Sequence, residues 1–199
     1  MNGQNKHIIL VFVLIYFICI ESRAQTSRFN GGIVAGLNFA ELEGNGTTDY
    51  FGLNAGILGT AKLSKHSQLS MEFLFSQNGE YVLPEYYPAL QYGQVWLNHI
   101  EVPIHIDWLI GVFESDEFYD WNLSIGFAYT RLLSYDVETI DKKNVNDQII
   151  YGSKEAYLLQ AGTTYFFTKK FGLNFRASLP IRVEGLSWTL AARLIYMIK

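Results

Sequence analysis

Residues 96–110 alternate between apolar and polar side chains with a period of two. The even positions carry Trp96, Ile100, Val102, Ile104, Ile106, Trp108 and Ile110, and the odd positions carry His99, Glu101, Pro103, His105 and Asp107. A period of two is the repeat of a β-strand and fits no helix. An apolar face with tryptophan towards both ends, opposite a polar face, is typical of a strand with lipid outside and polar groups inside a barrel.

Seven further segments alternate in the same way. They are residues 29–40, 50–63, 68–78, 118–130, 154–167, 171–181 and 186–198. The segment 154–167 is the weakest, because Leu158 and Phe166 fall on its otherwise polar side. An even number of strands returns both ends of the chain to the same side, as expected for an antiparallel arrangement.

The connections between these segments alternate in length. Residues 64–67, 111–117 and 168–170 are the shorter set, whereas 41–49, 79–93 and 132–153 are longer, with 183–185 as an exception. Outer-membrane barrels have short turns on the periplasmic side and long loops outside. After residue 24 no apolar run is long enough for a membrane helix, so a closed barrel is the remaining way to span a bilayer. The sequence therefore predicts an all-β, eight-stranded antiparallel up-and-down transmembrane β-barrel.

The first 24 residues have the parts of a secretory signal peptide. Lys6 gives a positive start, residues 8–20 form an unbroken apolar run, and Ser22 and Ala24 are small residues at the positions that a signal peptidase recognises. The run is shorter than the about 20 residues of a membrane-spanning helix. We expect cleavage after Ala24, which leaves residues 25–199 as an outer-membrane β-barrel domain.

The single cysteine, Cys19, lies within this leader. An uncleaved anchor or a lipoprotein is the alternative, but Ile18 is bulky where a lipoprotein signal needs a small residue. Cleavage also removes Lys6, Glu21 and Arg23, so the formal charge changes from −4 to −5. The exported chain then has no disulfide and no thiolate site, and its mild acidity argues against a nucleic-acid partner.

The predicted inward faces gather charged side chains of both signs. The interior of an eight-stranded barrel is just wide enough for side chains to fill, and an unpaired buried charge costs several kcal/mol. We therefore predict a packed interior polar network rather than an open pore. Its expected members are Lys62, Glu72, His99, Glu101, His105, Asp107, Asp120, Arg176 and Arg193.

A metal or proton-handling site on the strand of His99, Glu101, His105 and Asp107 is a weaker alternative. Residues two apart on one strand face lie about 7 Å from each other, and the spacing matches no zinc motif. For catalysis, no G-x-S-x-G or paired acid motif is present, and His66 lies in a predicted turn. We predict no catalytic residues, no cofactor and no metal.

The segment 79–93 is rich in tyrosine. It contains Tyr81, Tyr86, Tyr87 and Tyr92. Tyrosine is favoured at recognition surfaces because it combines a large apolar area with a polar tip. These residues form either a partner-binding loop or part of an interfacial aromatic girdle, and both interpretations stay open.

Several stretches resemble the PorT-like outer-membrane β-barrel family. Glu72-Phe-Leu-Phe-Ser-Gln-Asn-Gly79 and His99-Ile-Glu-Val-Pro-Ile104 are similar to that family's paired signatures, and Gly36-Leu-Asn-Phe39 and Gly52-Leu-Asn-Ala-Gly56 to its first two strands. The resemblance covers essentially the whole mature chain. It implies a Gram-negative, Bacteroidota-type barrel in a family whose founding members are accessory parts of a protein secretion system. The final Lys199 departs from the terminal aromatic of many outer-membrane strands.

These observations favour a non-enzymatic integral protein of the cell outer membrane, structural or accessory. The expected partners are outer-membrane lipid and other outer-membrane or secretion-system proteins. A lipid-modifying outer-membrane enzyme and a soluble lipocalin-like barrel are the alternatives, and the second would reverse the two faces of every strand.

Overall fold

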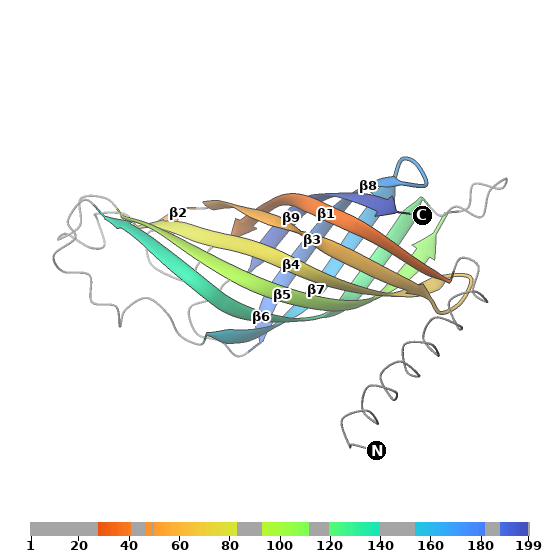
Figure 1. Cartoon of the computed structure of the whole chain (residues 1–199), viewed down its shortest axis with the longest axis horizontal. Coiled ribbons are helices and arrows are strands. Elements are labelled where there is room, and N and C mark those ends of the chain that lie inside the picture. The colour runs from red at the N-terminus through yellow and green to blue at the C-terminus, as the bar shows by residue number, and fades with distance from the viewer. Residues whose placement is uncertain are drawn as a thin grey trace, which may run out of the picture.

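A computed structural model describes residues 28–40, 47–48, 50–82, 93–111, 120–139, 154–181 and 188–198. The strands within them are β1 (Phe29–Ala40), β2 (Thr47–Thr48), β3 (Tyr50–Lys62), β4 (Ser67–Val82), β5 (Gly93–Ile110), β6 (Trp121–Thr139), β7 (Glu155–Phe166), β8 (Phe171–Ile181) and β9 (Thr189–Ile198). β2 is a two-residue strand that pairs with the end of β4. The other strands form the barrel wall (Figure 1).

The sheet closes on itself. Consecutive long strands pair antiparallel, β4 pairs with β5, and β1 pairs with β9. Following the register round the wall from Asn30 leads back to β1 at Ala40, ten positions further along the strand. In a closed barrel this stagger of the register requires the strands to tilt relative to the barrel axis. The prediction of an eight-stranded antiparallel up-and-down barrel is confirmed.

Three strands are longer than the sequence predicts. Residues 79–82 of β4 pair with residues 93–96 of β5, and β5 in turn pairs with β6 as far as Thr139. The predicted loops 79–93 and 132–153 are therefore partly strand. The backbone ladder continues here. On β6 the alternation also continues, with Leu133, Tyr135 and Val137 against Ser134, Asp136 and Glu138, so the predicted strand end at residue 130 is too early. We call residues 79–82, 93–98 and 133–139 the projecting sheet, which reaches beyond the other strands (Figure 1).

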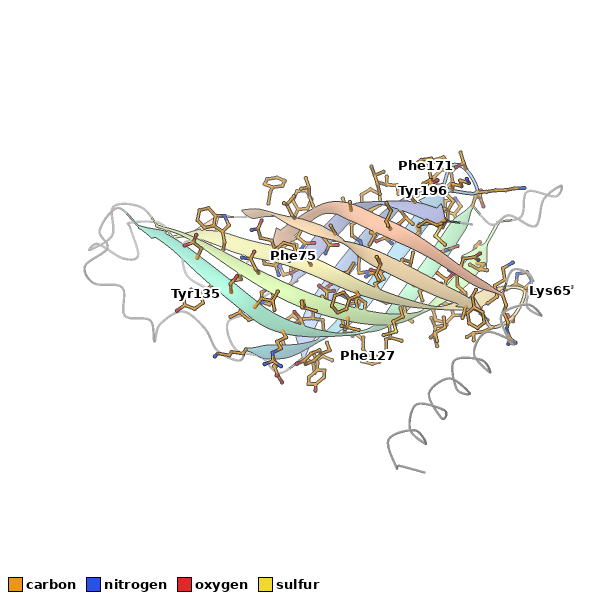
Figure 2. All side chains as sticks on the ribbon, in the orientation of Figure 1. Lys65, Phe75, Phe127, Tyr135, Phe171 and Tyr196 are labelled. Atoms are coloured by element: carbon orange, nitrogen blue, oxygen red, sulfur yellow. The ribbon has the colours of Figure 1, made fainter. Side chains whose placement is uncertain are left out.

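The outer surface of the barrel is apolar. Its exposed large side chains include Ile33, Leu37, Phe51, Leu53, Ile57, Met71, Phe73, Ile104, Ile106, Leu123, Ile125, Phe127, Phe175, Leu179, Leu190 and Leu194. Figure 2 shows such side chains around the wall, with Lys65 and Phe171 near the short-turn end and Tyr135 near the other. No helix within the described residues is long and apolar enough to cross a membrane.

Aromatic rings lie at both ends of this apolar surface. On β6 and β7, the rings of Trp121 and Tyr165 are 5.0 Å apart near the short turns. Those of Tyr129 and Tyr157 are 5.7 Å apart towards the opposite end of the same strand pair. Rings at the two ends of an apolar band match the aromatic girdles of membrane barrels.

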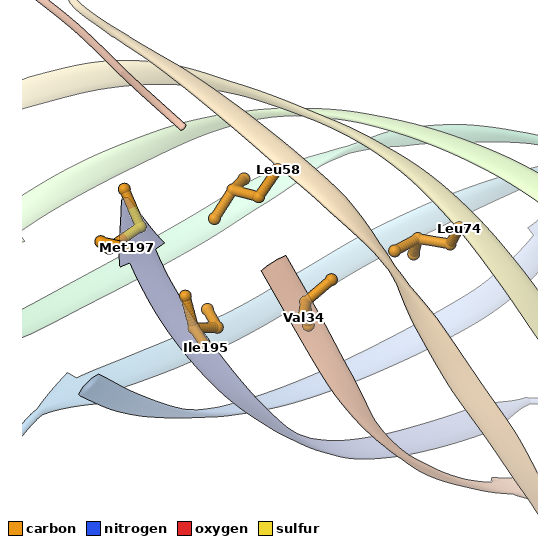
Figure 3. Close-up of a cluster of buried hydrophobic side chains, with 5 residues drawn as sticks. All are labelled: Val34, Leu58, Leu74, Ile195 and Met197. Atoms are coloured by element: carbon orange, nitrogen blue, oxygen red, sulfur yellow. The ribbon is translucent and has the colours of Figure 1, made fainter. Parts of the chain in front are cut away.

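One part of the interior is apolar. Val34, Leu58, Leu74, Ile195 and Met197 form a buried cluster inside the barrel, and Phe166 packs against it (Figure 3). Leu158 is also buried. Leu158 and Phe166 both lie on the inner side of β7, as the alternation predicts, and Phe166 meets apolar rather than polar side chains there. The inner face therefore carries an apolar patch on β1, β3, β4 and β9, strands that also carry the buried polar residues Asn38, Thr60, Glu72 and Arg193.

Candidate functional site in the barrel lumen

Alternation along each strand directs a row of polar side chains into the lumen. The row from β5 comprises His99, Glu101, His105 and Asp107, and facing positions on β4 and β8 supply Glu72 and Arg176. β9 supplies Arg193. All seven of these side chains are buried. Because the wall is a closed sheet, these polar groups have only one another and the lumen as surroundings.

Glu72 lies at the centre of an ionic cluster. Arg176 donates two hydrogen bonds to it, from Nη2 to Oε1 at 2.6 Å and from Nη1 to Oε2 at 3.0 Å. Arg193 Nη1 donates a third, to Oε2 at 2.8 Å. A two-point guanidinium–carboxylate contact is a strong and geometrically specific form of ion pair. The cluster joins β4 to β8 and β9, which lie more than 100 residues later in the sequence.

Asn174 orients the second guanidinium. Arg193 Nε and Nη2 both donate to Asn174 Oδ1, at 3.0 and 2.6 Å. Asn174 Nδ2 in turn donates to Thr164 Oγ1 at 2.8 Å. The contacts of Arg193 therefore involve all three of its nitrogens, which is what a buried guanidinium needs to offset its desolvation.

Gln160 links a second group of side chains. Its Nε2 donates to Glu101 Oε1 at 2.7 Å and to Ser178 Oγ at 2.9 Å. Its Oε1 lies 2.9 Å from His105 Nε2, which donates in this pairing because a carbonyl oxygen only accepts. The amide thus connects a carboxylate, a hydroxyl and an imidazole across β5, β7 and β8.

Asp107 forms a third group nearer the short-turn end. Gln68 Nε2 donates to its Oδ2 at 2.8 Å, and Ser70 Oγ donates to the same oxygen. Within the described residues Asp107 belongs to no ion pair. Its hydrogen-bond partners there are neutral, so the carboxylate has no direct counter-ion among the described residues, although Arg176 lines the same cavity as Asp107.

The remaining predicted members lie apart from these groups. Lys62 is half-buried at the short-turn end of β3, and Asp120 lies just before β6 with Oδ1 buried and without a hydrogen-bond partner. His99 is buried towards the opposite end, and its Nδ1 has no hydrogen-bond partner in the part of the chain that the structure describes. The structure therefore divides the nine predicted residues into separate groups rather than one continuous network.

Uncharged residues add hydrogen bonds that the predicted charged set does not include. Gln160 links Glu101 to His105, Asn174 bonds Arg193, Ser70 bonds Asp107, and Ser178 bonds Gln160. All four occupy inward positions in the alternation. These positions predict that they face the lumen, but the predicted network included only charged residues and histidines.

The predicted partner-binding tyrosines are only partly described. Tyr81 lies within β4, where its backbone pairs with Gln94, and not in a loop. This corrects the expected loop position, because the β4–β5 ladder continues beyond residue 78 as far as Val82. Tyr86, Tyr87 and Tyr92 lie outside the described residues.

Two cavities lie on either side of the Glu72 cluster. The larger, of about 480 Å³, extends towards the short-turn end and is lined by Lys62, Asp107, Asn122 and Met197 among others. The smaller, of about 20 Å³, is lined by Asn38, His99, Glu101 and Arg193. Both share Arg176 in their walls. The ionic cluster therefore occupies the lumen between them.

The described residues contain no group of three or more His, Cys, Asp or Glu side chains that could hold a metal ion. The hydroxyls of Ser70 and Ser178 are bonded to Asp107 and Gln160 rather than to a histidine. A serine nucleophile would need a base within hydrogen-bond reach. What this arrangement supports chemically is an ion-paired polar cluster around Glu72 that fills the lumen between the two cavities.

The fold is similar to that of outer-membrane barrels of known structure. Ail, the attachment invasion locus protein of Yersinia pestis, determined with the heparin analogue sucrose octasulfate, has a TM-score of 0.50 and 9% identity; the match covers 86% of this chain and 99% of that chain. Neisserial surface protein A has a TM-score of 0.48 and 12% identity, and the match covers 85% of this chain and 97% of that chain. OprG of Pseudomonas aeruginosa has a TM-score of 0.45 and 13% identity, and the match covers 85% of this chain and 91% of that chain.

No family model matches this sequence, and no curated protein matches it. Identities this low show a shared fold and nothing further about activity or partners. The chain has the fold of an eight-stranded outer-membrane β-barrel.

Proposed function

We propose that the protein is a non-enzymatic integral β-barrel of a bacterial outer membrane, with a structural or accessory role. The observation that carries this proposal is the distribution of side chains across the wall. Phe127, Ile57 and Leu194 are each about 60% exposed on the outside, whereas Arg193 and Glu72 are no more than 3% exposed inside. Hydrocarbon outside the barrel gives the apolar side chains a favourable environment.

A soluble barrel would need the opposite arrangement. Continuous apolar surface of this extent is rarely left in water by a soluble monomer, because its exposure promotes association. A lipocalin-like barrel would enclose the apolar faces and expose the arginines. The ion pairs inside and the leucines outside therefore favour the membrane barrel over that alternative.

The projecting sheet supports an accessory role outside the membrane. The last described pair between β6 and β7 joins Arg131 and Glu155, and β6 continues for eight further residues to Thr139. Leu133 and Tyr135 are exposed on this continuation. Exposed aromatic and apolar side chains on a rigid sheet are suited to binding another protein. The resemblance to PorT-like proteins favours an envelope or secretion assembly as the partner.

A lipid-modifying activity is the second candidate. It would need a nucleophile with a nearby base at the rim of the barrel. The hydrogen bonds of the lumen described above provide no such pair within the described strands. We therefore propose a non-enzymatic role, and lipid A profiles of cells with H99A or H105A should equal those of the wild type.

Membrane residence is tested by fractionation. The protein should stay with the outer membrane after carbonate extraction and should migrate differently on gels before and after heating. Release into the carbonate supernatant would contradict membrane integration.

The accessory role has its own test. A photo-crosslinking residue at Tyr135 should yield protein adducts in cells, whereas one at Phe127 should yield lipid adducts. If the residue at Tyr135 yields no protein adduct, docking through the projecting sheet is excluded. Membrane integration is unaffected by that result.

A further inference from the structure

The larger cavity has two chemically different walls. Asp107 on β5 lines one side, and Ile195 and Met197 on β9 line another. In the closed order of strands, β5 and β9 are four positions apart in either direction, so they face each other across the lumen. A molecule in this space would therefore contact polar groups along one side and apolar groups along the other.

The polar wall carries unused hydrogen-bonding capacity. Thr60 Oγ1, Asn122 Oδ1 and Ser124 Oγ are buried and have no hydrogen-bond partner among the described residues. Thr60 and Asn122 are each 6% exposed, and all three side chains line the cavity. Buried polar atoms are almost always satisfied in folded proteins, so three unpaired atoms that line one cavity, from β3 and β6, point to a missing partner.

The charge balance of the buried lumen is also incomplete. Its carboxylates are Glu72, Glu101 and Asp107, and its guanidiniums are Arg176 and Arg193. Glu72 is bonded to both guanidiniums, and Glu101 lines the small cavity together with them. Among these buried groups the charge left over is that of Asp107, which faces the large cavity and, within the described residues, accepts hydrogen bonds from Gln68 and Ser70. Lys62 and Lys169 line the same cavity.

We propose that this cavity binds a small amphipathic molecule that carries an ammonium group. The ammonium group lies against Asp107 and the oxygens of Asn122 and Ser124, and the apolar body packs against Met197, Ile195 and Phe166. Entry is from the short-turn end, where Lys62 and Lys169 line the mouth. A volume of about 480 Å³ lies within the range of small-molecule pockets.

The two methionines of the barrel provide a matched pair of reporters. Met197 lines the cavity, whereas Met71 is 53% exposed on the outer surface. In protein labelled with ¹³C at the methionine methyl groups and reconstituted in nanodiscs, benzylammonium should shift the Met197 signal with saturation. The Met71 signal reports only partition into lipid and should change in proportion to added compound. Benzyl alcohol and benzoate serve as neutral and anionic probes of the same shape.

The expected result is that benzylammonium binds at least tenfold more tightly than benzoate, and that D107N removes this preference. D136N, which removes a negative charge from an exposed position on the projecting sheet, should leave the affinity unchanged. K62M removes a cation from the mouth and should keep or raise the affinity.

Three results would overturn the proposal. They are a Met197 shift that never saturates, equal affinity for all three probes, and the same preference in D107N as in the wild type. If D107N does not fold, as judged by heat-modifiable migration, the comparison of the three probes on the wild-type barrel decides alone. Membrane integration is unaffected by any of these outcomes.

Discussion

Glu72 Oε2 on β4 and Arg193 Nη1 on β9, 121 residues apart in the sequence, lie 2.8 Å apart inside the barrel. This contact crosses the lumen between strands that are not neighbours in the wall. Arg176, also bonded to Glu72, adds a third strand. The cluster therefore acts as an internal brace that holds opposite sides of the barrel at a fixed distance.

E72A should destabilise the barrel strongly. Removal of the carboxylate leaves two buried guanidiniums without their counter-ion, and breaking a buried pair in this way costs about 3–5 kcal/mol. Urea titration in detergent, followed by loss of the heat-modifiable form, measures the change. E155Q is the control, because the Arg131–Glu155 pair is more than half exposed at both side chains and should contribute less than about 1 kcal/mol. Equal effects of the two substitutions would contradict the bracing role.

Replacing the whole cluster should be milder than breaking it. A triple variant with E72L, R176M and R193M removes all three charges and retains side-chain volume. Buried ion pairs replaced by apolar residues of similar size are often neutral or stabilising. The same titration should place the triple variant above E72A in stability. A triple variant less stable than E72A would show that the charges contribute more than mutual neutralisation.

Gly126 on β6 permits close approach between strands. A Cβ there would lie 2.0 Å from the Ile104 carbonyl oxygen and 2.7 Å from His105 Cδ2. G126A should therefore cost about 1–3 kcal/mol through overpacking. Gly59 is the control, since its Cβ would meet only the Met71 carbonyl oxygen at 3.9 Å. Thermal unfolding should distinguish the variants, and indistinguishable midpoints would contradict the close packing.

A charge on the apolar outer surface, which we call the apolar belt, should cost more the deeper it lies in the bilayer. F127R places a cation on the outer face between the aromatic pairs, where arginine costs about 2–4 kcal/mol near the bilayer midplane. S134R places the same cation on the projecting sheet, outside the belt, and should fold as efficiently as the wild type. The yield of folded protein in lipid vesicles measures both. A normal yield for F127R would argue against lipid contact at this face.

Orientation can be tested with single cysteines, because the chain after residue 24 contains none. Short turns are periplasmic in outer-membrane barrels, and Lys65 lies in such a turn. A membrane-impermeant maleimide should label D136C in intact cells and K65C only after the outer membrane is opened. The reverse pattern would show that the barrel is inserted the other way round.

Alternation predicted the strands well where one face meets lipid. The predicted bounds of β1 and β8 agree with the structure, as does the inward position of every charged residue in the Glu72 cluster. It ended β4, β5 and β6 too early. The segments after residues 78 and 130 were expected to be loops, although Leu133, Tyr135 and Val137 on β6 still alternate with Ser134, Asp136 and Glu138.

The partition of the lumen into groups was not predictable from one sequence. Which inward residues meet depends on the stagger between strands, and a shift of two residues along one strand would give Glu72 different partners. The apolar cluster around Met197 was missed for a related reason. Inner positions were expected to be polar, whereas Ile195 and Met197 follow Arg193 on the same inner row.

Contact between hydrocarbon and the outer face is measured most directly by quenching with brominated lipid. A variant carrying F127W, with Trp96, Trp108, Trp121 and Trp188 changed to phenylalanine, has its only tryptophan on the apolar belt. Bromine at the middle of the acyl chains should quench its fluorescence strongly, and aqueous acrylamide should quench it little. Quenching by acrylamide alone would mean that water, and not lipid, surrounds the barrel.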